Sequence, residues 1–277
     1  MRPENADRVL MMAVIFGTAS ALPLLLTFFG TRERPEFQRQ SQPKLKKSLQ
    51  SALKNRPFMF AVGIFLFTWT GLNIVQNMLL FFLKYRMNLE GKSDLVAGTV
   101  FISALITLPI WEWASRRWDK RLAYIAGMVF LSSVMITLIM IDPSWGFGVV
   151  MTLAALAGVG VAAVHVLPWS MIPDAVEVDE LETGERHEGM YYSLVLLLRK
   201  VASSIAIPMT LVVMGWSGYV SNAAVQTPQA VRAIQVLMGP VPSVFFCGGI
   251  IFALFYPLTR ERHAEIRKEI ARSQRPI

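Results

Sequence analysis

The chain of 277 residues is 54% hydrophobic and 17% charged, with a formal net charge of +8. Soluble domains usually carry about 25% charged residues, so this composition argues against a soluble protein and favours one that is embedded in a lipid bilayer. The positive charge does not require a nucleic-acid partner, because basic loops beside membrane spans give the same excess. The single cysteine, Cys247, lies in an apolar run and excludes a disulfide framework or a cysteine metal cluster.

Seven apolar runs are near or above the length of about 20 residues that crosses a bilayer as a helix. They are too long for the short alternating segments of a strand barrel, so the predicted fold class is an all-α membrane protein. No short apolar core followed by a small-residue cleavage site precedes them, so no signal peptide is expected. The predicted spans are Val9–Gly30, Phe58–Leu83, Leu95–Trp113, Leu122–Ile141, Trp145–Met171, Met190–Tyr219 and Val236–Leu258.

The basic residues predict how the spans are oriented. Nineteen of the 27 Lys and Arg residues lie after the first, third, fifth and seventh spans. Six lie on the opposite side, and the remaining two are Arg199 and Lys200. The side richer in Lys and Arg is the cytoplasmic one. We therefore expect a multi-pass protein of the cell (inner) membrane with its N-terminus outside and its C-terminus inside.

The chain is expected to have four parts. In the segment between the first two spans, Leu45, Leu49 and Leu53 recur every four residues among lysines. This spacing is typical of a short amphipathic helix on the membrane surface, and a solvated linker is the alternative. The parts are a single transmembrane helix (1–30), a central cytoplasmic loop with this amphipathic helix (31–56), a six-helix bundle (57–258) and a cytoplasmic tail (259–277).

Two adjacent cations interrupt the sixth span. Lys200 lies about 15 Å along a helix that begins near Met190. A lysine side chain can bring its ammonium group to the membrane surface only from near a helix end. A charge at this depth costs about 2.5–3.5 kcal/mol and usually faces a bundle interior or a watery cavity. We interpret Lys200 as part of a transport path. The alternative is a later start of the span near Leu194, which lets Lys200 and Arg199 reach the inner surface together.

The second span carries a polar row on one helical face. Thr70, Asn73 and Asn77 recur at a helical spacing, and Gln76 lies beside them. Polar groups in lipid require partners. They either hydrogen-bond to neighbouring helices or line an aqueous cavity, and the sequence leaves both readings open.

An acidic stretch follows the fifth span and is interpreted as a solvated cytoplasmic connection with a turn at Thr183-Gly184. It has neither the spacing of a metal site nor a nucleophile with its base. We therefore expect no enzyme activity, no catalytic residue and no bound metal. His165 in the fifth span is interpreted as a packing residue, with a proton relay as the less common alternative.

Residues 167–204 carry a recognisable motif, LPWSMIPDAVEVDELETGERHEGMYYSLVLLLRKVASS. The segment resembles a signature of the glycoside–pentoside–hexuronide:cation symporter family, the melibiose permease-like branch of the major facilitator superfamily. Weaker matches occur at Asn55–Phe58, Phe81–Met87 and Tyr256–Arg267. The order of these motifs fits helices six to twelve of the twelve-helix fold, so the resemblance covers nearly all of this chain but only the second part of the family's length. The same LPWSM run is also similar to that of the animal sodium-dependent lysolipid transporters.

The resemblance implies secondary active transport of a small-molecule solute, a sugar or glycoside, together with sodium, lithium or a proton and without a bound cofactor. Symport of a lysolipid or other solute, or an inactive truncated remnant, is the alternative. Lys200 matches the family's helix-eleven lysine, which lies beside the cation and sugar sites. The resemblance implies that its carboxylate partners belong to an N-terminal half, which is expected as a partner missing from this chain. Asn73, Gln76, Asn77 and Thr70 are expected on the substrate path, and Asp174 and Arg186 at an inner gate or in loop packing.

Overall fold

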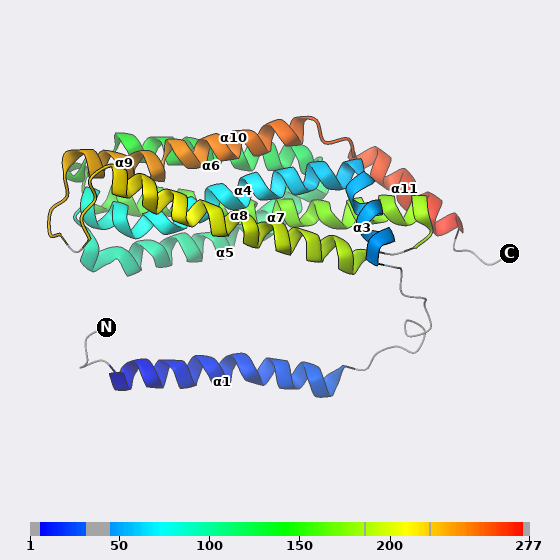
Figure 1. Ribbon diagram of the computed structural model, residues 1–277, viewed down its shortest axis with the longest axis horizontal. Helices are drawn as coiled ribbons and strands as arrows, with labels where there is room; N and C mark the ends of the chain where they lie inside the picture. The colour runs from blue at the N-terminus through cyan, green and yellow to red at the C-terminus, as the bar shows by residue number, and fades with distance from the viewer. Residues whose placement is uncertain (1–5, 32–44, 186, 222, 274–277) are drawn as a thin grey trace. The chain divides into compact units, whose positions relative to one another are not determined.

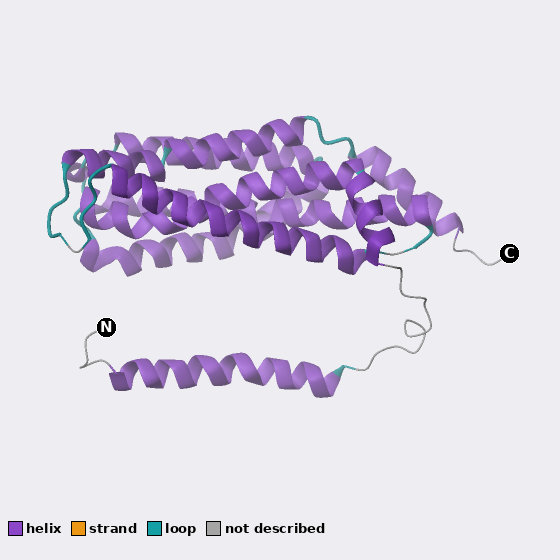
Figure 2. Cartoon of the chain, in the orientation of Figure 1, coloured by secondary structure: helices purple, strands orange, loops and turns teal. Residues whose placement is uncertain are grey.

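The computed structural model describes residues 6–31, 45–185, 187–221 and 223–273. Every regular element in these ranges is a helix, as Figure 2 shows. The chain divides into two compact units, residues 1–43 and residues 44–277. Each unit is described separately below.

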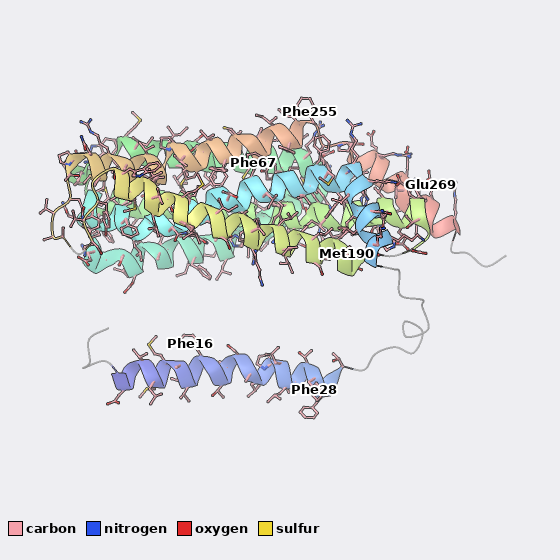
Figure 3. All side chains as sticks on the ribbon, viewed as in Figure 1. Phe16, Phe28, Phe67, Met190, Phe255 and Glu269 are labelled. Carbon is pink, nitrogen blue, oxygen red and sulfur yellow. The ribbon has the colours of Figure 1, made fainter. Side chains whose placement is uncertain are left out.

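The first unit contains one helix, α1 (Ala6–Gly30). Its apolar side chains are exposed all round, including Phe16 and Phe28, which project from the helix in Figure 3. Pro23 removes a backbone donor inside the helix, and the Thr27 hydroxyl donates to the Pro23 carbonyl at 2.8 Å. A helix that is apolar on every face is suited to lipid rather than to water.

The second unit is a helical bundle whose long helices run side by side (Figure 1). The element η2 is a π-helical end of α4, and η3 and η4 are short 3-10 turns. The elements are α3 (Leu45–Lys54), α4 (Arg56–Phe81), η2 (Phe82–Arg86), η3 (Glu90–Lys92), α5 (Ser93–Arg117), α6 (Lys120–Met140), η4 (Pro143–Trp145), α7 (Phe147–Thr183), α8 (Glu188–Trp216), α9 (Pro228–Met238), α10 (Pro240–Leu254) and α11 (Arg260–Ser273).

Within the described residues, seven segments are long and apolar enough to cross a membrane, which confirms the seven predicted spans. The last span starts earlier than predicted, because Thr227 caps α9 and Pro228 occupies its first turn. This span consists of two helices, α9 and α10. The break falls at Gly239, where the following Pro240 has no backbone N–H to continue α9.

The acidic stretch is not a solvated loop, and this prediction is wrong. The helix α7 runs on through it to Thr183, and Gly184 ends the helix in a left-handed conformation (φ 69°), in agreement with the predicted turn at this position. Asp174 and Asp179 are buried on the extended helix. Burial is tolerated because both carboxylates have cationic or hydrogen-bonding partners from distant parts of the chain.

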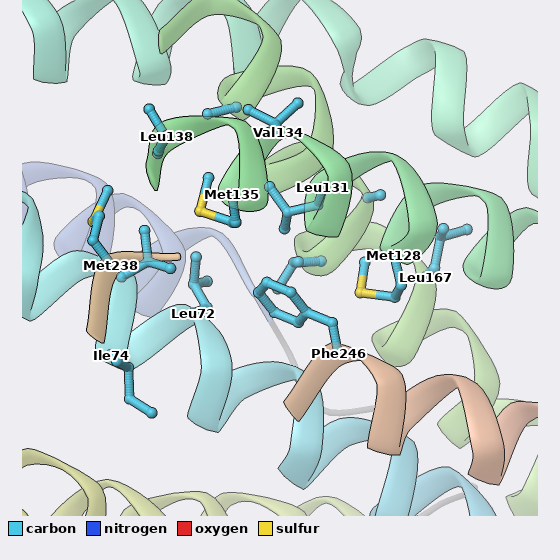
Figure 4. Packing of buried hydrophobic residues seen from close by; sticks show 14 of the residues in the cluster. Leu72, Ile74, Met128, Leu131, Val134, Met135, Leu138, Leu167, Met238 and Phe246 are labelled. Atoms are coloured by element: carbon cyan, nitrogen blue, oxygen red, sulfur yellow. The ribbon is translucent and has the colours of Figure 1, made fainter. Parts of the chain in front are cut away.

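The main core of the second unit lies between α4, α6, α7 and α10. Leu72, Met128, Leu131 and Phe246 meet there with less than 2% of each residue exposed (Figure 4). Gly71 allows the Phe246 ring to approach α4, since a Cβ at this position would lie 2.7 Å from the ring. Close packing of this kind fixes the relative positions of the helices that carry the polar side chains.

Two spans take little part in this core. Only 6% of the apolar window of α5 and 17% of that of α8 is buried, against 44–50% for the other spans of this unit. Exposed side chains on these helices include Phe101 and Ile106 of α5 and Leu197 and Met209 of α8. The unit therefore presents α5 and α8 as outward apolar faces.

Candidate functional site

A polar contact joins α4 to α8. The Asn73 side-chain amide donates to the Ser203 hydroxyl at 2.7 Å, and the Asn77 amide donates to the Asn73 carbonyl at 2.8 Å. Both asparagines are half-buried. Within the predicted polar row, Asn73 thus hydrogen-bonds to a neighbouring helix and also lines a cavity. Thr70 is half-buried one turn before Asn73 and Asn77 continues the same face, whereas Gln76 is exposed.

A cavity of about 420 Å³ lies over this contact, and it brings Asn73 and Lys200 together. Arg199 is half-buried, with its guanidinium carbon 4.9 Å from the centroid of the Trp69 ring. This distance is that of a cation–π contact. Lys200 is exposed at the same cavity. The cavity therefore has one cation held against an aromatic ring and a second that is exposed.

A second cavity, of about 320 Å³, is almost entirely apolar. It is lined from α4, α5, α6, α7 and α9 by side chains such as Leu72, Val100 and Leu153. The polar side chains in its lining are Gln76 and His165. Its walls contain the π-helical turn η2, a local irregularity that is frequent near functional sites.

The linings of the two cavities are in contact where α4 faces α7. The rings of Trp69, which lines the cationic cavity, and His165, which lines the apolar one, are edge to face with centroids 5.2 Å apart. The exposed imidazole hydrogen-bonds through Nδ1 to the Val161 carbonyl at 2.9 Å, so Nδ1 carries a proton and Nε2 does not take part in this bond. We refer to the two cavities together as the paired site.

Asp174 lies away from the paired site, in an ionic cluster. The Lys120 ammonium donates to both carboxylate oxygens at 2.7 and 2.8 Å and to the Ser170 carbonyl at 2.8 Å. The His263 Nε2 atom lies 2.7 Å from Glu177 and 3.4 Å from Asp174. The cluster joins the start of α6 and the extended part of α7 to α11. Arg186, predicted to act with Asp174, falls outside the described residues.

Sequence reasoning missed Trp69 and Ser203, two members of the paired site. Trp69 precedes Asn73 by four positions, and Ser203 follows Arg199 by four, so each pair shares a helical face. This spacing could have placed Trp69 and Ser203 beside the residues that were named. It could not have shown that Arg199, rather than Lys200, packs against the indole, because that choice depends on how α8 is rotated against α4.

Comparisons with known proteins give the family. The family profile described as "MFS/sugar transport protein" matches residues 2–260. An uncharacterised symporter of Synechocystis is 34% identical over 83% of this chain and 43% of its own length. A sodium-dependent lysophosphatidylcholine symporter of Danio rerio is 26% identical over 88% of this chain and 46% of its own length.

A sphingosine-1-phosphate transporter of Xenopus tropicalis is 24% identical over 94% of this chain and 52% of its own length. The chain thus spans about half the length of the curated relatives it matches. The seven apolar helices make it an all-α, multi-pass membrane protein. With the profile match over most of its residues, the chain belongs to the MFS/sugar transport protein family of the major facilitator superfamily.

Proposed function

We propose that the chain is the C-terminal portion of a cation-coupled symporter, with helices six to twelve of a twelve-helix fold, and that its cargo is a single-chain amphiphile with an anionic group. Relatives that are sodium-dependent lysophosphatidylcholine symporters support a lysolipid better than a sugar. The co-transported ion would be sodium, lithium or a proton. The charge distribution supports a cell-membrane location with the basic tail inside.

The observation that carries this proposal is the paired site. An acyl chain suits the apolar cavity, because burying each methylene group stabilises binding by about 0.8 kcal/mol. An anionic headgroup suits the adjoining cavity, where Arg199 and Lys200 offer charge-assisted hydrogen bonds to phosphate. Trp69 and His165 lie in contact between the cationic cavity and the apolar cavity.

A sugar or glycoside is the second candidate, favoured by the description of the family profile and by the polar row on α4. Sugars need many hydrogen-bond partners, since each polar group buried without one is costly. The amide donors of Asn73 and Asn77 already bind within the bundle. The apolar lining of the second cavity also supports an amphiphile over a sugar.

The outward faces of α5 and α8 support an N-terminal half as the partner of this bundle. Transporters built from two repeats hold substrate near mid-membrane, between the repeats, and expose the site by rocking one repeat against the other. The cationic cavity lies on α4 and α8, and α8 is one of the two poorly buried spans. The proposed partner would cover the cavity and supply carboxylates for Lys200.

The test compares uptake in cells that carry variants at the native gene. Ala104→Phe fills the apolar cavity, whereas Ile136→Phe adds the same ring to an exposed position of α6 outside the cavity lining. We expect Ala104→Phe to lower the initial rate of cation-dependent lysophosphatidylcholine uptake by about tenfold, a loss of about 1.4 kcal/mol. Ile136→Phe should leave uptake unchanged.

Two results would overturn the proposal. Uptake of a labelled disaccharide that exceeds uptake of the lysolipid would support the sugar candidate. Absence of cation-dependent uptake of either compound, with the protein present in the membrane, would support an inactive remnant. Glycerophosphocholine, which has no acyl chain, serves as the control for headgroup binding and should compete weakly.

A further inference from the structure

A buried histidine connects three helices at the end of the bundle where Met190 and Glu269 lie (Figure 3). The side chain of His187 is 0% exposed. Its Nδ1 atom lies 2.6 Å from a carboxylate oxygen of Asp179, and its Nε2 atom lies 3.2 Å from a carboxylate oxygen of Glu185. Asp179 belongs to α7, and His187 directly precedes α8. Both ring nitrogens therefore face acceptors.

Each of the two carboxylates also holds α3. The Ser51 hydroxyl donates to the second oxygen of Asp179, and the Lys47 ammonium donates to Glu185 at 2.8 Å. At the end of α3, the Asn55 amide donates to the Ala175 carbonyl of α7 at 2.8 Å and to the Tyr191 hydroxyl of α8 at 3.0 Å. The helix α3 is thus fastened to the junction of α7 and α8 through two carboxylates that share one imidazole.

The two carboxylates around His187 require a protonated imidazole if both are to accept a hydrogen bond from it. Neutral imidazole has one N–H donor and one acceptor nitrogen, whereas imidazolium has two donors. Carboxylates only accept when they are ionised. The ammonium of Lys47, through its hydrogen bond, lowers the pKa of the Glu185 carboxyl and keeps it ionised. A neutral His187 would direct a lone pair at one of the two carboxylates.

We infer that His187 is a proton-binding site that locks α3 onto the α7–α8 junction when it is protonated and releases α3 when it loses the proton. The groups facing it are Asp179 from α7 and Glu185 from its own loop. One contact farther lie Lys47 of α3 and Tyr191 of α8. The inference rests on this geometry alone and holds whatever the cargo of the paired site.

The direction of the pH dependence follows from the donors. Protonated His187 donates hydrogen bonds to Asp179 and Glu185 together, so α3 is held most firmly at low pH. As the pH rises and the proton leaves, Glu185, which is 40% exposed, turns to water, and the contact with Lys47 weakens.

Hydrogen–deuterium exchange of residues 45–54 measures the lock directly, with the whole chain in lipid nanodiscs and rates corrected for intrinsic pH dependence. We expect protection of α3 to fall by about tenfold between about pH 5.5 and about pH 9. His187→Gln should show low protection at both values. His165→Gln, which removes a histidine hydrogen-bonded to its own helix, should behave as the unaltered chain.

Glu185→Gln provides the decisive comparison and does not require His187→Gln to fold. In this variant the new side-chain amide can donate to the Nε2 atom of neutral His187, while its oxygen still accepts from Lys47. We expect α3 to stay protected at both pH values in this variant. The inference is wrong if Glu185→Gln loses protection with pH as the unaltered chain does. It is equally wrong if protection of α3 in the unaltered chain does not change with pH.

Discussion

Arg199 and Lys200 are adjacent in sequence but have different surroundings. The guanidinium of Arg199 lies over Trp69, whereas Lys200 is exposed at the cationic cavity. We expect Lys200→Leu, placed in the native gene, to lower the initial rate of cation-driven uptake by at least about tenfold, because a hydrogen bond to a charged group contributes about 1.5–3 kcal/mol.

The matched control for this variant is Lys200→Arg, which keeps the charge and should retain a measurable part of the uptake. Membrane levels of both variants are compared by immunoblot. Normal gradient-driven uptake by Lys200→Leu would show that Lys200 does not take part in binding or coupling.

The small residues of α7 show how single positions set helix packing. A Cβ on Gly158 would collide with the Ser103 hydroxyl and with the backbone oxygen of Val100 on α5. A Cβ on Gly148, near the start of the same helix, would meet open space. We expect Gly158→Ala to destabilise the bundle by about 1–3 kcal/mol through overpacking. Gly148→Ala should be neutral or stabilise it by up to about 1 kcal/mol through helix propensity.

Thermal unfolding of the two variants in the same detergent checks this pair of predictions. Opposite signs for the two changes are the expected outcome. Equal melting temperatures for Gly158→Ala and the unaltered chain would mean that α5 and α7 do not pack as closely as the structure indicates.

The apolar spans could be predicted from the sequence, since their length and hydrophobicity depend on local composition. The continuation of α7 through Asp174 and Asp179 could not, because a run of acids resembles a solvated loop until its partners are known. Lys120 is 54 positions from Asp174, and Ser51 is 128 positions from Asp179. Contacts of such separation leave no trace in a single sequence.

The segment before α4 gives an intermediate case. A helix does occupy Leu45–Lys54. Its buried face consists of Ser48 and Ala52, while Leu49 and Leu53 are exposed beside lysines. The pattern of leucines predicts contact with the membrane surface, which stays a prediction. The pattern of small residues that packs against protein was not recognised, because serine and alanine are common in both settings.

At the scale of the whole molecule, the outward faces of α5 and α8 suit a native product that is longer than this chain. An antibody to the tail after Arg260 would measure the mass of the native product. We expect a band of roughly 60 kDa, corresponding to two halves of about the mass of this chain, because the chain spans about half the length of its relatives. A band near 31.0 kDa, the mass of this chain alone, would instead favour a transporter made of two copies of this chain.

The helix α7 has 37 residues and is about 55 Å long, whereas a bilayer core is about 30 Å thick. We therefore expect one end of α7 to extend from the membrane into water. His165 would lie on the membrane part, and Asp174 and Asp179 on the part beyond it. A tilt of a few degrees at the cargo would swing the tip by about 2–3 Å. Pro168 and Pro173 interrupt the backbone hydrogen bonds between the two parts and set how stiffly that swing is transmitted.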